Sequence, residues 1–453
     1  MKKTTIYVLI LGIITSTISC KKDFLQVKQN AKVVQITAAD CQAILDNYDI
    51  MNSEYPSHGE LSSDDYFVLS ANAIGNGENQ QFYRWEPNAQ VLAGADYSWA
   101  IPYLIVYNAN VVIQAVEKEP GALDQTTLNG LKGSALFFRA NMFYQLAQLY
   151  TKQYDPNTAN QDLGIPVRTD PSISVESSRG SVQQTYDQII KDFKEAIELL
   201  PNTSSKASRP NKAAAYAALA KTYLTMGNYT DAGSYANECL KIYSSLMDYN
   251  TLNQVSSTPF VRFNSEVIFQ SYMQAKSITQ PNTQAFVDLD LYNSYASDDL
   301  RKSLFFKPKT GGYRFSGSYN QTTVSNFFNG IAVDEVYLIR AECNARNGKI
   351  IEAMNDLNTL LVTRWKSGTY VNMTASNAED ALIKVLTERR KELIFRGRRW
   401  TDLKRLNKDI RFQKTLIRNV DGATYTLPPN DLRYSLLLPL VALNYSSLQQ
   451  NPR

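Results

Sequence analysis

The chain has 453 residues, of which 44% are hydrophobic and 20% charged, and its formal net charge is +4. These proportions are typical of globular proteins and exclude collagen-like and strongly disordered chains. One short stretch, residues 388–407, carries eight basic and three acidic residues, so the rest of the chain has no excess of positive charge. A protein-wide basic surface for nucleic acid is therefore excluded.

The first 20 residues, MKKTTIYVLILGIITSTISC, have two lysines, then an apolar segment, then small residues before Cys20. This pattern predicts a secretory signal peptide over residues 1–19, because the apolar segment is too short to span a membrane permanently. The ending TISC resembles the bacterial lipobox, with threonine where leucine is usual, so we expect lipidation of Cys20 and a tether over residues 20–35. An ordinary signal peptide, with Cys20 inside the mature chain, is the alternative.

The first irregular region, about residues 51–98, is rich in Asn, Ser, Gly and aromatic residues and has little helical periodicity. Long irregular segments of compact proteins are usually functional or disordered, and the aromatic content favours function. An aromatic ring can stack on the apolar face of a sugar while polar neighbours bond the hydroxyls. The candidates for ligand contact are Tyr66, Tyr83, Arg84 and Trp85, with Trp99 at the start of the next helix.

Helical periodicity dominates from about residue 126 to 246. In residues 211–246 large and small apolar residues fall where a tetratricopeptide repeat places them, and Gly227 stands at the expected turn. Residues 181–201 supply the second helix of an earlier pair, whose first helix is expected over 131–150. These pairs predict an all-α helical-repeat scaffold in which each pair buries its apolar face against its neighbours.

The second irregular region, about residues 248–330, again has many Asn, Ser, Gly and aromatic residues. Its segment GGYRFSGSYN combines a glycine turn with rings and a charged donor, and it adds the candidates Tyr313, Arg314, Phe315 and Tyr319. Aromatic residues in loops also serve as packing anchors, which is the competing interpretation for every candidate. The sequence does not show whether the two irregular regions meet.

A third helix pair begins near residue 333, and one further helix is expected from about 379 to 407, with a bend or a close contact at Gly397. This last helix contains the basic stretch ERRKELIFRGRRWTDLKRLN. Its charges are spaced so that they can pair along the helix, and its apolar residues form a stripe that must pack on a neighbour. We therefore expect a structural role, with the pairs Glu388–Lys391, Glu392–Arg396, and Asp402 with Arg398 or Arg405.

No catalytic or metal-binding motif stands out. The only histidine, His58, is expected in a surface loop, and Cys239 and Cys343 are expected as buried thiols, so neither a zinc site nor a cofactor is predicted. The adjacent pairs Asp64–Asp65 and Asp298–Asp299 could supply glycosidase carboxylates, but such pairs more often cap helices or make turn hydrogen bonds. We therefore expect a binding protein and not an enzyme.

Several stretches together resemble the SusD/RagB family, the outer-membrane lipoproteins that serve nutrient uptake in Bacteroidetes. The resemblance covers nearly the whole mature chain in the right order, although the C-terminus lacks the further glycine and aromatic residue often seen there. The matching stretches are KKDFL after Cys20, WAIPYLIVYNANVVIQAVE (99–117), GSALFFRANMFYQLAQLY (133–150), GIPV (164–167), SVQQTYDQIIKDFKEAIELLP (181–201), YLIRAECNARNG (337–348), the basic stretch, and LLLPLVALNYSSLQQNPR (436–453).

The resemblance implies one SusD-like domain over residues 36–453, built from tetratricopeptide-like helix pairs with loop-built binding surfaces. It implies a lipid-anchored protein on the outer face of the outer membrane that binds an oligosaccharide, or in some members a peptide. The implied partner is a SusC-like TonB-dependent transporter, and nucleic acid is not an expected partner. Two other hypotheses remain open: an envelope scaffold that binds protein partners, and a lipid-anchored glycan hydrolase.

Overall fold

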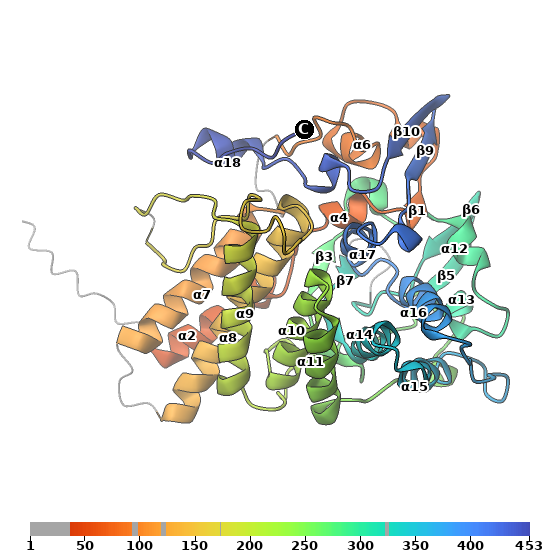
Figure 1. The fold of residues 1–453 in the computed structure, drawn as a ribbon, viewed down its shortest axis with the longest axis horizontal. Coiled ribbons are helices and arrows are strands. Elements are labelled where there is room, and N and C mark those ends of the chain that lie inside the picture. The colour runs from red at the N-terminus through yellow and green to blue at the C-terminus, as the bar shows by residue number, and fades with distance from the viewer. Residues whose placement is uncertain (1–36, 93–97, 119–123, 173, 322–325) are drawn as a thin grey trace, which may run out of the picture.

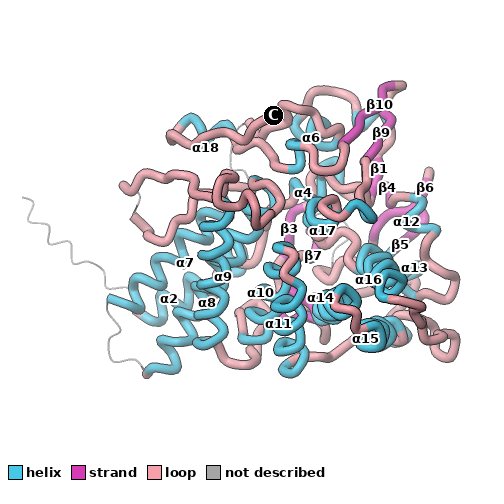
Figure 2. The backbone as a smooth tube through the Cα atoms, viewed as in Figure 1, coloured by secondary structure: helices cyan, strands magenta, loops and turns pink. Residues whose placement is uncertain are grey.

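The computed structural model describes residues 37–92, 98–118, 124–172, 174–321 and 326–453. The predicted signal peptide, Cys20 and the whole tether lie outside these residues. Long helices run side by side across the molecule, and short helices, strands and loops cover one side and one end (Figure 1). Figure 2 shows how much of that covering is loop. Among the described residues, no helix is long and apolar enough to cross a membrane.

The first predicted helix pair is confirmed. It consists of α8 (Gln125–Tyr150) and α9 (Val182–Leu199), which pack against each other. Ser181 starts α9 with a capping box, in which its side chain and that of Gln184 each bond the other's backbone N–H. On the other side of α8 lie α7 (Ala100–Lys118) and α2 (Ala38–Leu45). Because α8 has neighbours on several sides, nearly every residue in its second half is buried.

The second pair is also confirmed, with α10 (Lys212–Met226) and α11 (Tyr229–Ile242) joined by a short turn. Gly227 makes this turn with φ of 78°, a left-handed conformation that favours glycine. Asn228 then caps α11 by accepting the backbone N–H of Asp231. The predicted small residues Ala220 and Ala232 are fully buried, consistent with close packing of the two helices.

The third pair comprises α14 (Val333–Arg346) and α15 (Ile350–Leu361), and α16 (Ala378–Glu392) packs beyond them. Although about ninety residues separate α11 from α14 in the sequence, these helices pack directly on each other. Their approach is close, since a Cβ added at Gly233 of α11 would lie 3.1 Å from Cβ of Cys343. The three pairs therefore form one continuous tetratricopeptide-like array.

The single helix expected from about 379 to 407 is wrong. The chain leaves the helix after Glu392 and a separate helix, α17 (Arg399–Leu406), follows. Between them Phe395 and Gly397 adopt positive φ values of 54° and 70°. The predicted bend at Gly397 is thus a complete break, because two left-handed residues cannot continue a right-handed helix.

Short elements that the sequence did not predict lie in and next to the two irregular regions and in the C-terminal segment. The strands among the described residues form two-stranded antiparallel ribbons. They are β1 (Tyr66–Phe67) with β4 (Phe286–Val287), β2 (Val267–Phe269) with β8 (Ile331–Ala332), β3 (Tyr272–Gln274) with β7 (Asn326–Phe328), β5 (Phe306–Lys309) with β6 (Gly312–Phe315), and β9 (Leu416–Val420) with β10 (Ala423–Leu427). Short helices are α3 (Tyr48–Met51), α4 (His58–Leu61), α5 (Ser70–Ala73), α6 (Glu78–Tyr83), α12 (Leu289–Asn293), α13 (Leu300–Phe305) and α18 (Leu440–Asn444).

Candidate ligand-binding site

The two irregular regions meet in the structure. Strand β1 of the first region pairs with β4 of the second, with Phe67 opposite Phe286. The side-chain amide of Asn79 also donates a hydrogen bond of 2.9 Å to the hydroxyl of Ser277. Residues about two hundred positions apart thus build one surface.

Six of the nine candidate residues are buried in the structure. Their exposed fractions are 6% or less, so they do not present a surface to a ligand in this structure. The physical reason is that each has partners inside the protein: the Arg418 guanidinium lies 3.6 Å from the ring centroid of Tyr83, and Tyr319 donates to Glu266 at 2.7 Å. The packing of the protein interior therefore accounts for six of the candidates: Tyr66, Tyr83, Arg84, Trp85, Phe315 and Tyr319.

Of the other three candidates, two are half-buried and Trp99 is buried. Tyr313 and Arg314 are half-buried on β6, and the Tyr313 ring stacks on Tyr292 with centroids 3.6 Å apart. Trp99 stands at the start of α7, as expected, and is 9% exposed. Of these three, Trp99 lines a well-formed cleft.

This cleft, here called the aromatic cleft, lies between α7, the loop 166–177 and α18, and has a volume of about 320 Å³. Figure 1 shows α18 above α7, the two helices that contribute lining residues. Helix α7 contributes Tyr103 and Tyr107 after Trp99, and Tyr445 follows α18. Polar side chains also line the cleft: Asn110, Arg168, Asp170, Ser177 and Ser446.

The floor of the aromatic cleft is fixed by internal contacts. The Trp99 ring packs on Tyr103 and, edge to face, on Tyr150, with centroid separations of 4.9 and 5.1 Å. The Tyr103 hydroxyl donates to the Pro166 carbonyl at 2.9 Å. Because burial raises the pKa of Tyr103, this hydroxyl stays neutral and remains a donor. The floor is therefore preorganised.

The rim of the aromatic cleft is more exposed. Tyr107 is 44% exposed and Tyr445 86% exposed, so both rings can reach a ligand. Arg168 holds the loop in place by donating to the Ser172 and Val175 carbonyls and to the Ser177 hydroxyl. The cleft thus combines aromatic faces with a few polar groups, the usual composition of a small-ligand site.

Sequence reasoning missed Tyr107 and Tyr445. A signal for Tyr107 was present, since Trp99, Tyr103 and Tyr107 are spaced four apart and must share one face of a helix. Tyr445 had no local signal, because only the return of the C-terminal segment to α7 brings it to the cleft.

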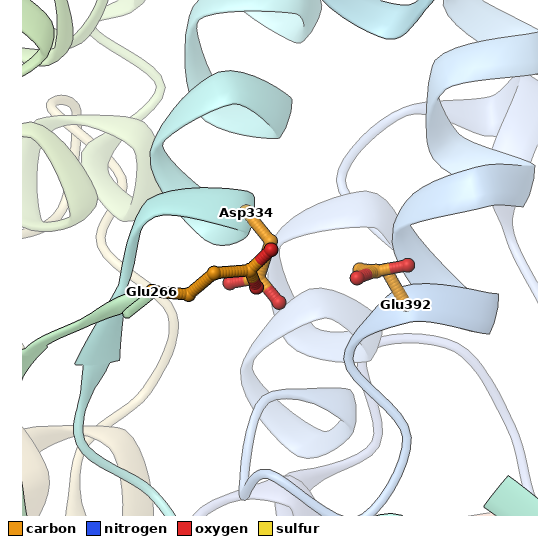
Figure 3. Close-up of side chains that lie close together, drawn as sticks. All are labelled: Glu266, Asp334 and Glu392. Atoms are coloured by element: carbon orange, nitrogen blue, oxygen red, sulfur yellow. The ribbon is translucent and has the colours of Figure 1, made fainter. Parts of the chain in front are cut away.

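A second group of functional-looking residues is the carboxylate cluster of Glu266, Asp334 and Glu392, whose oxygens lie within 4.8 Å of one another. Figure 3 shows the three side chains converging from the segment before β2, the start of α14 and the end of α16. Arg364 bonds both Glu266 and Glu392 at 2.8 Å, and Arg396 lies 2.7 Å from Asp334. Since arginines already neutralise these carboxylates, the cluster fits a buried ion-pair network better than a metal site.

The basic stretch belongs to this network. Two of the pairs expected along the helix are confirmed, Glu388–Lys391 at 2.9 Å and Asp402–Arg405 at 2.8 Å. The predicted ion pair between Glu392 and Arg396 is wrong. Arg396 instead pairs with Asp334, and Glu392 pairs with Arg364. Asp402 likewise does not pair with Arg398, which instead reaches Glu335 at 3.0 Å. Most of the charge is neutralised by other elements, which the break after α16 makes possible.

The suggested glycosidase carboxylates are also held in ion pairs. Asp64 accepts from Arg399 at 2.6 Å and Asp299 from Arg301 at 2.7 Å. Asp299 additionally caps α13, as expected for one member of an adjacent acidic pair.

The expectation of a surface loop for His58 is wrong: His58 starts α4, is fully buried, and its Nε2 lies 3.2 Å from Glu78.

The prediction that Cys239 and Cys343 are buried thiols is confirmed. Cys239 and Cys343 are free and buried, and burial raises the pKa of the Cys239 thiol to about 12. A thiol with this pKa is protonated near neutral pH and behaves as a small apolar side chain.

Comparisons with known proteins agree with the fold. Residues 23–224 match a family model described as "Starch-binding associating with outer membrane", and residues 265–435 match the SusD family model. The SusD-like protein P2 of Formosa agariphila is 25% identical over 372 residues, covering 68% of this chain and 71% of that protein.

Two solved structures extend the comparison to the whole described chain. A SusD superfamily protein from Bacteroides thetaiotaomicron has a TM-score of 0.76 at 22% identity, covering 92% of this chain and 100% of its own. A laminarin-binding SusD-like protein has a TM-score of 0.65 at 18% identity, covering 91% and 98%. These structures share the fold, and the two family models together span most of the sequence: the chain belongs to the SusD/RagB family.

Proposed function

We propose that this protein is a glycan-binding lipoprotein of the outer membrane that captures an oligosaccharide and passes it to a SusC-like TonB-dependent transporter. The observation that carries the proposal is the aromatic cleft, where exposed Tyr107 and Tyr445 face a floor containing Trp99. Sugar rings offer apolar C–H faces for such side chains, and Arg168 and Asp170 supply polar contacts at the edge.

The family supports the other parts of the proposal. One structural relative is named for binding laminarin, and one matching family model is described as associating with the outer membrane. In this proposal Cys20 carries the lipid anchor, the chain faces the cell exterior, and the protein binds its ligand without catalysing a reaction. The domain is taken as the single unit 36–453 that delivers ligand to the transporter.

A screen of oligosaccharides and peptides against the mature protein, followed by calorimetric titration, tests ligand binding. Replacing Tyr107 or Tyr445 by Ala should weaken binding by about 1 to 2 kcal/mol, or roughly fivefold to thirtyfold, through the loss of ring stacking and apolar contact. Phe263→Ala is the matched control, because Phe263 is an aromatic residue of 49% exposure outside the cleft. Equal weakening in the control, or none in the cleft variants, would contradict the assignment.

Product analysis of the same mixtures addresses the hydrolase hypothesis. Prolonged incubation of the mature protein with a bound oligosaccharide should leave its length unchanged, since Asp64 and Asp299 are held by arginines. Release of shorter products, with loss of release in Asp64→Asn, would favour a glycan hydrolase.

The scaffold hypothesis has one structural feature in its favour, an open polar groove of about 490 Å³ between α11, α14 and α15. Arg340, which lines this groove, is already bonded to Asp356 at 2.6 Å. Purification of the tagged full-length lipoprotein from outer membranes separates the hypotheses. The transport hypothesis predicts that a TonB-dependent transporter is recovered with the protein. If other proteins are recovered instead, and Arg340→Ala abolishes their recovery, the scaffold hypothesis would be favoured.

A further inference from the structure

The ribbon of β5 and β6, at the right of Figure 1, carries its positive charges on one face. The strand register sets Lys307 opposite Arg314 and Lys309 opposite Gly312. Residues directly opposite in an antiparallel pair project to the same side, so Lys307, Lys309 and Arg314 form one surface, here called the basic face. Like charges placed opposite each other in a ribbon destabilise it, so this arrangement costs stability.

The basic face has only uncharged partners. Lys307 donates to the Gln254 and Ser303 carbonyls, and Lys309 donates to the Pro281 and Ala285 carbonyls at 3.2 and 3.3 Å. Arg314 donates to the Ser316 hydroxyl at 2.9 Å. Within the described ranges, no carboxylate lies within 4.0 Å of any of the three. These contacts orient the side chains without neutralising them.

The three charges also act on one another. Burial lowers the pKa of Lys307 and of Lys309, and the nearby Arg314 guanidinium lowers both further. Burial lowers the pKa of Arg314 as well. A nearby anion would reverse these effects, because an opposite charge favours the protonated form.

The arginines of the basic stretch are paired with carboxylates. All six arginines between Glu388 and Asn407 have a carboxylate within 4.0 Å, supplied either by neighbours on the helix or by distant elements. The basic face differs from these arginines. It resembles buried Lys404 and Arg418, which also bond carbonyls and have no carboxylate within 4.0 Å among the described residues.

Aromatic rings adjoin the basic face. The Lys309 ammonium lies 4.1 Å from the ring centroid of Phe286, which stacks on Phe67 at 5.3 Å with an interplanar angle of 19°. Tyr313 pairs with Pro308 and therefore projects to the opposite face of the ribbon, where its ring stacks on Tyr292. Because Phe286 is 3% exposed, its ring supports the Lys309 ammonium from inside the protein, and charge is what the basic face offers to a ligand.

We propose that the basic face is a second ligand site, which binds the carboxylate or sulfate group of an acidic saccharide. Lysine and arginine N–H groups would make charge-assisted hydrogen bonds to such an oxyanion and remove the mutual repulsion of the three cations. The choice of a saccharide rests on the proposed glycan-binding function, whereas the choice of an anion rests on the basic face alone. The site is separate from the aromatic cleft, with which it shares no lining residue.

Matched glycan pairs test this proposal. Calorimetric titration would compare oligogalacturonates with their fully methyl-esterified forms, and sulfated galactan oligosaccharides with their desulfated forms. The test variant combines Lys307→Gln, Lys309→Gln and Arg314→Gln, and Arg314→Gln alone serves if the triple variant does not fold. The control combines Lys191→Gln, Lys206→Gln and Lys349→Gln, which removes the same charge from three exposed lysines.

We expect the wild type to bind one acidic member about tenfold more tightly than its neutral match at low salt, and the difference to shrink as salt is added. The test variant should lose this preference and unfold at a temperature no lower than the wild type, since repulsion has been removed. The control should keep the preference. A folded test variant that keeps the preference would overturn the proposal, and so would Arg314→Gln if it keeps the full preference where the triple variant is strongly destabilised.

The remaining outcomes separate this inference from the proposed function. Equal binding of acidic and neutral members would overturn the second site while leaving glycan binding intact. Binding to phosphatidylglycerol vesicles through the basic face, without any acidic-glycan preference, would replace the saccharide with a lipid headgroup and overturn the proposal. Absence of binding to every glycan would overturn both.

Discussion

Glu392→Gln tests whether the buried ion-pair network holds the repeat array and the loop-built surface together. Glu392 is fully buried, and its two carboxylate oxygens accept from Arg364 at 2.8 Å and from Arg301 at 3.0 Å. Arg364 comes from the segment after α15 and Arg301 from α13, so this one carboxylate links the array to the second irregular region. Glutamine keeps the shape of the side chain and removes its charge.

The expected loss of stability depends on which carboxylate partners Arg364 and Arg301 keep in the variant. Removing one partner of a buried ion pair typically costs about 3 to 5 kcal/mol, because a charge is left uncompensated. Arg364 keeps Glu266, while Arg301 keeps Asp299 and Glu388, so we expect the lower end of this range, about 3 kcal/mol.

Urea unfolding followed by tryptophan fluorescence at pH 7 measures the loss. The matched control is Glu379→Gln, since Glu379 is 57% exposed at its side chain and lies 3.9 Å from Arg411. The control should change the free energy of unfolding by no more than about 0.5 kcal/mol. A loss below about 1 kcal/mol in Glu392→Gln would refute the reasoning, because it is what an exposed ion pair gives.

Three further predictions concern pH, packing and the anchor. Burial raises the pKa of Glu392, but Arg364 and Arg301 outweigh this effect and lower the pKa to about 2 from 4.5. The stabilisation that ionised Glu392 provides should therefore be present at pH 7 and be lost as the pH falls from about 5 towards 2. Over this range the urea midpoint of the wild type should fall more steeply than that of Glu392→Gln. Gly330→Ala should lower the free energy of unfolding by about 1 to 3 kcal/mol, because the added Cβ would lie 2.1 Å from the Phe269 carbonyl oxygen. Gly130→Ala is the control. Its Cβ would have nothing within 4 Å, so this variant should be neutral or stabilising in the same urea assay. Cys20→Ala should abolish fatty-acid labelling and release the protein from membranes, and unchanged labelling would contradict the lipobox assignment.

The helical repeats could be predicted because they are encoded locally. Gly227 marks its turn and the apolar spacing of residues 211–246 marks both helices, without reference to distant parts of the chain. The break after Glu392 was harder, since the residue that joins Gly397 in a left-handed conformation is Phe395, for which that conformation is rare.

The loop-built surfaces could not be predicted for the opposite reason. Tyr83 and Tyr319 lie in segments that look exposed, and only long-range contacts, such as the pairing of β1 with β4, reveal that they are packed. The partners of Arg396 and Arg398 are likewise remote in sequence, so spacing along one helix favoured the wrong pairs. Tyr445 reaches the aromatic cleft only through the path of the C-terminal segment.

A crystal structure of the mature protein with its best-binding oligosaccharide tests the central claim most directly. The proposed function predicts density for sugar rings in the aromatic cleft, in contact with Tyr107 and Tyr445 and with polar contacts to Arg168 or Asp170. An empty cleft in a crystal that holds the oligosaccharide elsewhere on the protein would contradict it.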